Sequence, residues 1–155
     1  MPYPFKLEVG IGLPGLVVSG VNPRPDPQCV LNEHLPQGLL DRVIKNDQAW
    51  DVTFYWNVSG LVAEAIGPFD WNCCVYLLCL SNQGGVSFSK YQQAPYKTGA
   101  DSDYIVKVDI PPTTQGGVPV GMYKLYTSID VIHSPAVLPV TMFGEGPTMK
   151  FYKPG

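Results

Sequence analysis

The stretch WDVTFYWNV, residues 50–58, alternates large apolar side chains with mostly polar ones along its whole length. A period of two is that of a β-strand with one buried face. The apolar face of this strand collects five side chains: Trp50, Val52, Phe54, Trp56 and Val58. The sequence therefore predicts a strand here whose apolar face belongs to the core.

Similar signals recur along the chain, separated by Gly- and Pro-rich turns. We expect further strands at residues 5–13, 72–80, 86–89, 104–110, 121–131 and 148–152. Helical spacing occurs only in residues 36–44, over one or two turns. Short strands between turn signals, without long helices, indicate an all-β, antiparallel β-sandwich of about seven strands.

With 155 residues, the chain is long enough for one domain with a sizeable core. Residues 1–45 are expected to form an N-terminal strand and an extended Pro/Gly-rich arm, packed on the same domain or on a neighbour, and residues 46–155 the β-sandwich. Its expected core comprises ten side chains: Val52, Phe54, Trp56, Val75, Leu77, Val106, Val108, Tyr123, Leu125 and Ile129.

Tyr123 follows Gly121 by two residues, near the start of the penultimate expected strand. This placement resembles the tyrosine corner of immunoglobulin-like and fibronectin-type-III-like sandwiches, and the likeness in strand order covers residues 50–152. It implies an immunoglobulin-like fold in which the Tyr123 hydroxyl hydrogen-bonds to the loop backbone. The Cys…Trp…Cys pattern of antibody domains is missing. The resemblance therefore concerns the fold and no particular family, and such a fold does not determine function.

The composition argues against two classes of partner. The net charge is −3 and charged residues are only 15% of the chain, whereas nucleic-acid binding needs clustered Lys and Arg. No apolar run approaches the length of a membrane span, so membrane insertion is not expected.

The first ten residues lack the pattern of a signal peptide, which indicates synthesis in the cytoplasm and leaves the final location open, whether extracellular or on a particle.

The four cysteines, Cys29, Cys73, Cys74 and Cys79, show no metal-binding spacing. Two interpretations stay open. Three of them lie in the apolar run NCCVYLLCL, so they suit the role of small buried hydrophobes. Alternatively, Cys29 forms a disulfide with one of the other three.

Candidates for catalysis and metal binding are few. His34 and His133 are the two histidines, and no G-x-S-x-G or Cys/His signature accompanies them. Asp101 and Asp103 form an Asp-x-Asp pair, but the rest of a calcium loop is missing. We therefore expect no catalytic, cofactor or metal site, and a protein that is not an enzyme.

The low charge content suggests that part of the surface is covered by other copies of the chain, because the cores of interfaces are depleted in charge. A terminal strand with apolar side chains at every second position can add to the sheet edge of a neighbour, as in the donor strands of pilus-like subunits. The chain is thus expected to be a self-assembling structural subunit of a filament, tube or particle. The alternative is that this strand belongs to its own sandwich. The interface candidates are Phe5, Leu7, Val9, Ile11 and Leu13.

A second functional hypothesis is a monomeric module that binds carbohydrate or protein. Trp71 lies beside a turn in FDWN and is expected to be exposed, unlike Trp50 and Trp56. Tyr91 and Tyr96 occur in the polar stretch KYQQAPYK, which is expected to be a loop. These three aromatic side chains are the candidate ligand contacts.

Overall fold

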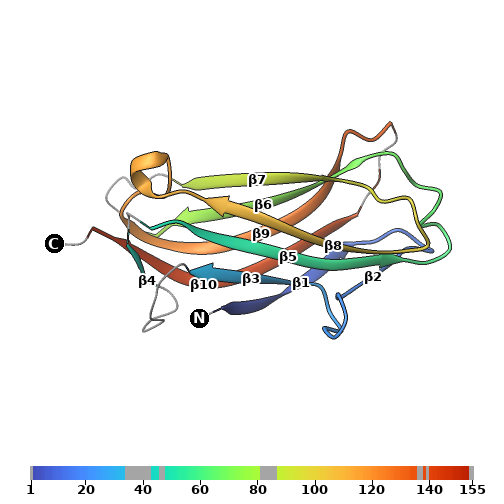
Figure 1. Ribbon diagram of the computed structural model, residues 1–155, viewed down its shortest axis with the longest axis horizontal. Helices are drawn as coiled ribbons and strands as arrows, with labels where there is room; N and C mark the ends of the chain where they lie inside the picture. The colour runs from blue at the N-terminus through green and yellow to red at the C-terminus, as the bar shows by residue number, and fades with distance from the viewer. Residues whose placement is uncertain are drawn as a thin grey trace.

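The computed structural model describes residues 2–33, 43–45, 48–80, 87–135, 138 and 140–153. These residues form ten β-strands and one short 3-10 helix, η1, and the strands run along the long axis of the molecule (Figure 1). Among them, no helix is long and apolar enough to cross a membrane. The elements are β1 (Tyr3–Ile11), β2 (Val17–Ser19), β3 (Gln28–Glu33), β4 (Val43–Lys45), β5 (Trp50–Ser59), β6 (Asp70–Cys79), β7 (Phe88–Pro95), β8 (Asp101–Ile110), η1 (Thr113–Gln115), β9 (Gly121–Ile132) and β10 (Thr141–Tyr152).

The strands form one curled sheet in the order β2-β5-β3-β1-β10-β9-β6-β7, and β8 pairs with β5. Every described pair is antiparallel except β4 with β10. β1 connects the two halves of the sheet: residues 3–6 pair with β3, and residues 7–11 pair with β10. The all-β, largely antiparallel architecture expected from the sequence is confirmed.

The core lies between the two halves of the curled sheet. Trp56 on β5 meets Trp71 on β6 with 5.7 Å between ring centroids, and it stacks on Tyr104 of β8 at 4.9 Å. Trp50 and Phe151 make a further contact across the core, at 5.6 Å. All ten expected core side chains are buried.

The N-terminal third differs from the expectation. Instead of one strand and an extended arm, its described residues contribute β1, β2, β3 and β4 to the sheet. The helix predicted from the spacing of residues 36–44 is wrong at its end. Val43 and Ile44 belong to β4, whose backbone pairs with β10. Residues 36–42, His34 and the expected turn at residues 82–85 lie outside the described part of the chain.

The prediction of a tyrosine-corner hydrogen bond is also wrong. Tyr123 is fully buried, but its hydroxyl has no hydrogen-bond partner among the described residues. Its ring folds back over Gly121, where a Cβ would lie 3.3 Å from the ring, and meets Phe151 edge-on at 5.6 Å. Tyr123 therefore acts as a core aromatic and does not form the expected tyrosine corner.

The four cysteines form no disulfide with one another. Cys29 and Cys73 are fully buried, as expected of small hydrophobes, whereas Cys74 and Cys79 are half-buried. The Cys29 thiol donates a hydrogen bond to Thr127 Oγ1 across 3.4 Å. Burial raises the pKa of the Cys29 and Cys73 thiols well above the ordinary value, which makes them unreactive in the folded chain.

Candidate functional site

The outer face of β6, β9 and β10 exposes large apolar side chains. Alternation along a strand sends Leu77 of β6 and Leu125 of β9 into the core and turns their chain neighbours outward. Five outward side chains, which we call the apolar face, are exposed: Tyr76, Leu78, Met122, Tyr126 and Phe143.

The strand register brings these side chains together. Tyr76 lies directly opposite Tyr126 in the β6–β9 pair, and Phe143 is opposite Ser128, one diagonal step from Tyr126. Opposite and diagonal neighbours on one sheet face are about 5–8 Å apart, close enough for large side chains to touch. At one end, the Leu80 amide donates to the Met122 carbonyl at 2.8 Å, which places another exposed leucine beside Met122.

A shallow groove of about 420 Å³ lies at the β1 side of the apolar face. Phe143 is 54% exposed there, and its ring covers Gly10 of β1, where a Cβ would be only 2.7 Å from the ring. The absence of a side chain at Gly10 therefore allows this position of Phe143. The groove is lined by Lys6, Glu8, Tyr126, Phe143, Gly144 and Glu145.

Charged groups surround the groove and partly neutralise one another. Lys124 Nζ lies 3.3 Å from Glu145 Oε1, and Glu145 is the more exposed of the two. Lys6 and Glu8 contribute one charge of each sign from β1. The apolar face thus has a charged border on its β1 side and no strong field of one sign.

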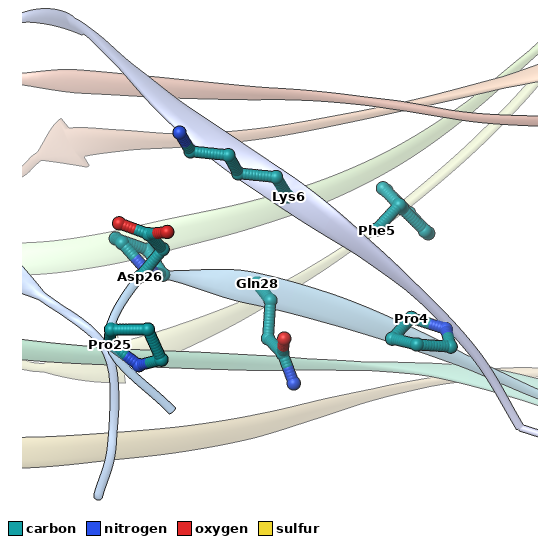
Figure 2. A pocket seen from close by; sticks show the side chains of 7 residues that line it. Pro4, Phe5, Lys6, Pro25, Asp26 and Gln28 are labelled. Carbon is teal, nitrogen blue, oxygen red and sulfur yellow. The ribbon is translucent and has the colours of Figure 1, made fainter. Parts of the chain in front are cut away.

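A second, smaller hollow of about 270 Å³ lies on the other side of β1, and Figure 2 shows the side chains that line it. Lys6 and Asp26 lie at one end of it and Pro4 at the other. Its wall is kept in place by the backbone, since the Leu7 amide donates to the Pro27 carbonyl at 2.9 Å. This hollow has less apolar surface than the groove. Its apolar lining consists of three prolines and one half-buried aromatic ring, that of Phe5.

The expected N-terminal strand exists as β1, and it is paired within its own chain. Leu7 is buried in the core, and Phe5 and Leu13 pack against it. Val9 is exposed, and the side chain of Ile11 lies outside the described part. Because β1 is bonded to β3 and to β10, pairing with another copy would require it to leave its own sheet.

The expected exposure of Trp71 is wrong: its side chain is 0% exposed. It lies on the inward face of β6, where its ring meets Phe69 at 5.1 Å. The loop expected around Tyr91 and Tyr96 is wrong as well, because residues 88–95 form β7. Tyr96 packs on Phe69 at 4.4 Å and donates its hydroxyl proton to the Ala63 carbonyl. Neither Trp71 nor Tyr96 therefore offers a free ring.

Tyr91 alone of the three expected ligand contacts is well exposed, at 61%. It lies on β7 opposite Cys74 of β6, and it extends the outward side of the sheet beyond Tyr76. The sequence did contain a signal for the rest of the apolar face. Met122 and Tyr126 occupy positions on the polar face of an alternating strand, where they are interspersed with Lys124 and Ser128.

The described catalytic and metal-binding candidates, His133, Asp101 and Asp103, each contact a neighbouring polar side chain. His133 Nδ1 lies 2.8 Å from Asp70 Oδ2 at the surface. Asn57 Nδ2 donates to the carboxylates of both Asp101 and Asp103, at 2.8 Å for Asp103, so an amide lies between these acids. Within the described ranges, no group of three or more His, Cys, Asp or Glu side chains could hold a metal ion.

No protein-family model matches the chain, and no curated protein matches it either. The function is therefore inferred from the fold and from the apolar face.

Proposed function

We propose that this chain is a non-enzymatic structural subunit that associates with copies of itself. The observation that supports this most is the apolar face, where five large side chains lie exposed in a chain with only 15% charged residues. Contiguous exposed apolar surface is uncommon on monomers and is typical of interaction sites. A filament, tube or particle built from such subunits would cover this face.

The proposal includes an immunoglobulin-like β-sandwich as the scaffold. β3, β5 and β8 form one half of the curled sheet, and β7, β6, β9 and β10 form the other. This is the strand order of a fibronectin-type-III-like sandwich, with β1 added between the halves. The order supports the assignment, although the tyrosine-corner hydrogen bond is missing.

Two routes of association are open to this chain. The first buries the apolar face, which is already exposed. The second exchanges β1 between copies, which requires breaking its pairing with β3 and β10. We favour the apolar face because it costs no internal hydrogen bonds.

The native mass in solution tests the proposal. Light scattering and negative-stain imaging should show particles far above the 17.0 kDa of one chain. The Tyr126→Ser, Phe143→Ser double variant should return the chain to monomers, because it removes two central rings of the apolar face. The matched control is Ile105→Ser, since Ile105 is 61% exposed on β8, in the other half of the sheet.

A monomeric wild type at high concentration would contradict the proposal. If particles form but require residues 1–14 rather than Tyr126 and Phe143, strand exchange is the route instead.

The alternative function is a binding module for carbohydrate or protein. The exposed ring of Tyr91 and the groove, with two aromatic walls and two carboxylates, favour it. Binding on a glycan array that is lost in Tyr91→Ala or Phe143→Ala, in a chain that stays monomeric, would support this function over self-assembly.

A further inference from the structure

Three oxygen-bearing side chains form a row across β6, β9 and β10, on the same outer side of the sheet as the apolar face. Asn72 of β6 lies directly opposite Asp130 of β9. Thr141 of β10 lies beside Asp130, because the next pair along these two strands joins Met142 to Ile129. Met142 and Ile129 are buried in the core, so alternation turns their chain neighbours outward. We call Asn72, Asp130 and Thr141 the oxygen row.

Each member of the oxygen row has a buried oxygen that is unpaired. Asn72 Oδ1, Asp130 Oδ1 and Thr141 Oγ1 have no hydrogen-bond partner among the described residues. They are half of the six buried side-chain atoms in this state in the described part of the chain, and they lie side by side. A buried polar atom without a partner costs free energy, so several in one place indicate a ligand that completes them.

An asparagine on β5 shows how an amide ordinarily lies beside acids. Asn57 Nδ2 donates to the carboxylates of both Asp101 and Asp103, at 2.8 Å for Asp103. In the oxygen row, the buried unpaired atom of Asn72 is its oxygen, next to the unpaired carboxylate oxygen of Asp130. Two acceptors, one of them on an acid, attract a ligand that brings positive charge.

We propose that the oxygen row binds a calcium ion, with Asn72 Oδ1 and Asp130 Oδ1 as ligands. Carboxylate and amide oxygens are the protein ligands that this ion takes, and its flexible geometry suits positions fixed by a sheet. Magnesium demands a nearly ideal octahedron, and zinc or copper prefers the nitrogen and sulfur of His and Cys.

Thr141 has a different role in the proposed site. A Cβ at Gly10 of β1 would lie 3.4 Å from Thr141 Oγ1, so this hydroxyl lies toward β1. We therefore assign it to a water on the ion, from which Oγ1 accepts a hydrogen bond. All three side chains of the oxygen row are half-buried, which leaves the outer positions around the ion to water. A single carboxylate gives weak binding, with a Kd of about 0.1–1 mM.

The ion would join β6 to β9 and act on the stability of the fold. Asn72 and Asp130 are far apart in the chain and meet only through the register of the two strands. The unfolded chain therefore lacks the site, and calcium stabilises the folded state by mass action. This inference is independent of the proposed self-association, because the oxygen row shares no residue with the apolar face.

Thermal unfolding of the full chain tests the site. After removal of metal with EDTA, the wild type in CaCl₂ at about 10 mM, some tenfold above the weakest expected Kd, should gain about 3–6 °C in Tm. MgCl₂, and NaCl of equal ionic strength, should give no comparable gain. Isothermal titration calorimetry with CaCl₂ should show saturable binding.

Two variants of the oxygen row give opposite results. Asp130→Asn removes the charge and keeps the shape, so it should abolish the gain in Tm. Asn72→Asp places a second carboxylate opposite Asp130, so it should lower Tm in EDTA and tighten calcium binding. The matched controls, Asp109→Asn and Asp103→Asn on β8, change acids in the other half of the sheet and should keep the full gain.

Several outcomes would overturn the site. One is a wild type without a gain in CaCl₂, or with an equal gain in MgCl₂ or NaCl. A gain that persists in Asp130→Asn would place the ion elsewhere. If Asn72→Asp lowers Tm in EDTA and binds calcium no more tightly, the Asn72 amide donates to Asp130 and no ion lies between them. Asn72→Asp also decides the question if Asp130→Asn fails to fold.

Discussion

Leu77 and Leu78 are neighbours in β6 and face opposite sides of the sheet. Leu77 is fully buried, whereas Leu78 belongs to the apolar face. Leu77→Ala should lower the free energy of unfolding by about 2–5 kcal/mol, because it leaves a cavity in the core. Leu78→Ala should change it by less than about 0.5 kcal/mol, as expected for a surface position. Equal shifts in the denaturant midpoint would contradict this placement of β6.

The buried thiols predict a loss of stability in alkali. Burial raises the pKa of the Cys29 and Cys73 thiols above the ordinary 9.0. Above pH 9.0, the unfolded chain therefore loses thiol protons that the folded chain retains, and stability falls as the pH rises. Thermal unfolding measured on both sides of this pH should show the decline, and it should be shallower in a Cys29→Ala, Cys73→Ala double variant. An identical pH dependence would exclude these thiols as its cause.

At the level of strands, hydrophobic periodicity predicted the position and the buried face of a strand best where only one face is buried. β8 alternates between exposed and buried side chains from Asp103 on, and the expected core side chains of β5 and β8 are all in place. β2 and β4 have three residues each, too few to show a period, and they form because neighbouring strands supply their hydrogen bonds. The exposure of Trp71 was predicted wrongly because a turn signal precedes it in the sequence. In the structure, the pairing of β6 with β9 already begins at Asp70, so Trp71 lies within the strand.

The apolar face could be predicted only in part. Alternation alone identifies Tyr126 as an outward residue of its strand. Its proximity to Tyr76 and Phe143 depends on long-range register, which no local pattern contains. The same holds for the groove, since the position of Phe143 requires Gly10 from the far end of the chain.

Among the described strands, β7 pairs with β6 alone, and its inward side carries Lys90 and Gln92 between Phe88 and Ala94, which pack against the core. Lys90 is opposite Val75, whose side chain is buried, and Gln92 is opposite Cys73. An inward-pointing charge on an edge strand discourages pairing with other chains. Lys90→Ile should therefore raise turbidity on storage, whereas Lys90→Arg should behave like the wild type. Unchanged turbidity in Lys90→Ile would show that other features protect this edge.

For the whole molecule, the apolar nature of the proposed contact surface predicts how assembly responds to salt. Burial of apolar side chains is strengthened by sulfate, whereas exposed ion pairs are screened by salt. Assembly through the apolar face should persist in concentrated sodium chloride and grow in ammonium sulfate, as followed by light scattering. The Tyr126→Ser, Phe143→Ser variant should stay monomeric in both solutions. Particles that dissociate in sodium chloride would indicate a charge-driven contact.

The position of β1 between β3 and β10 has a consequence for biosynthesis. β1 precedes every other described strand in the chain, but residues 7–11 pair with β10, which follows all of them. The nascent chain therefore cannot complete this part of its sheet before β10 has been synthesised, and until then residues 7–11 lack their partner strand. Contacts that span nearly the whole chain also slow folding. Until β10 emerges, residues 7–11 of the growing chain present an unpaired strand edge to other chains.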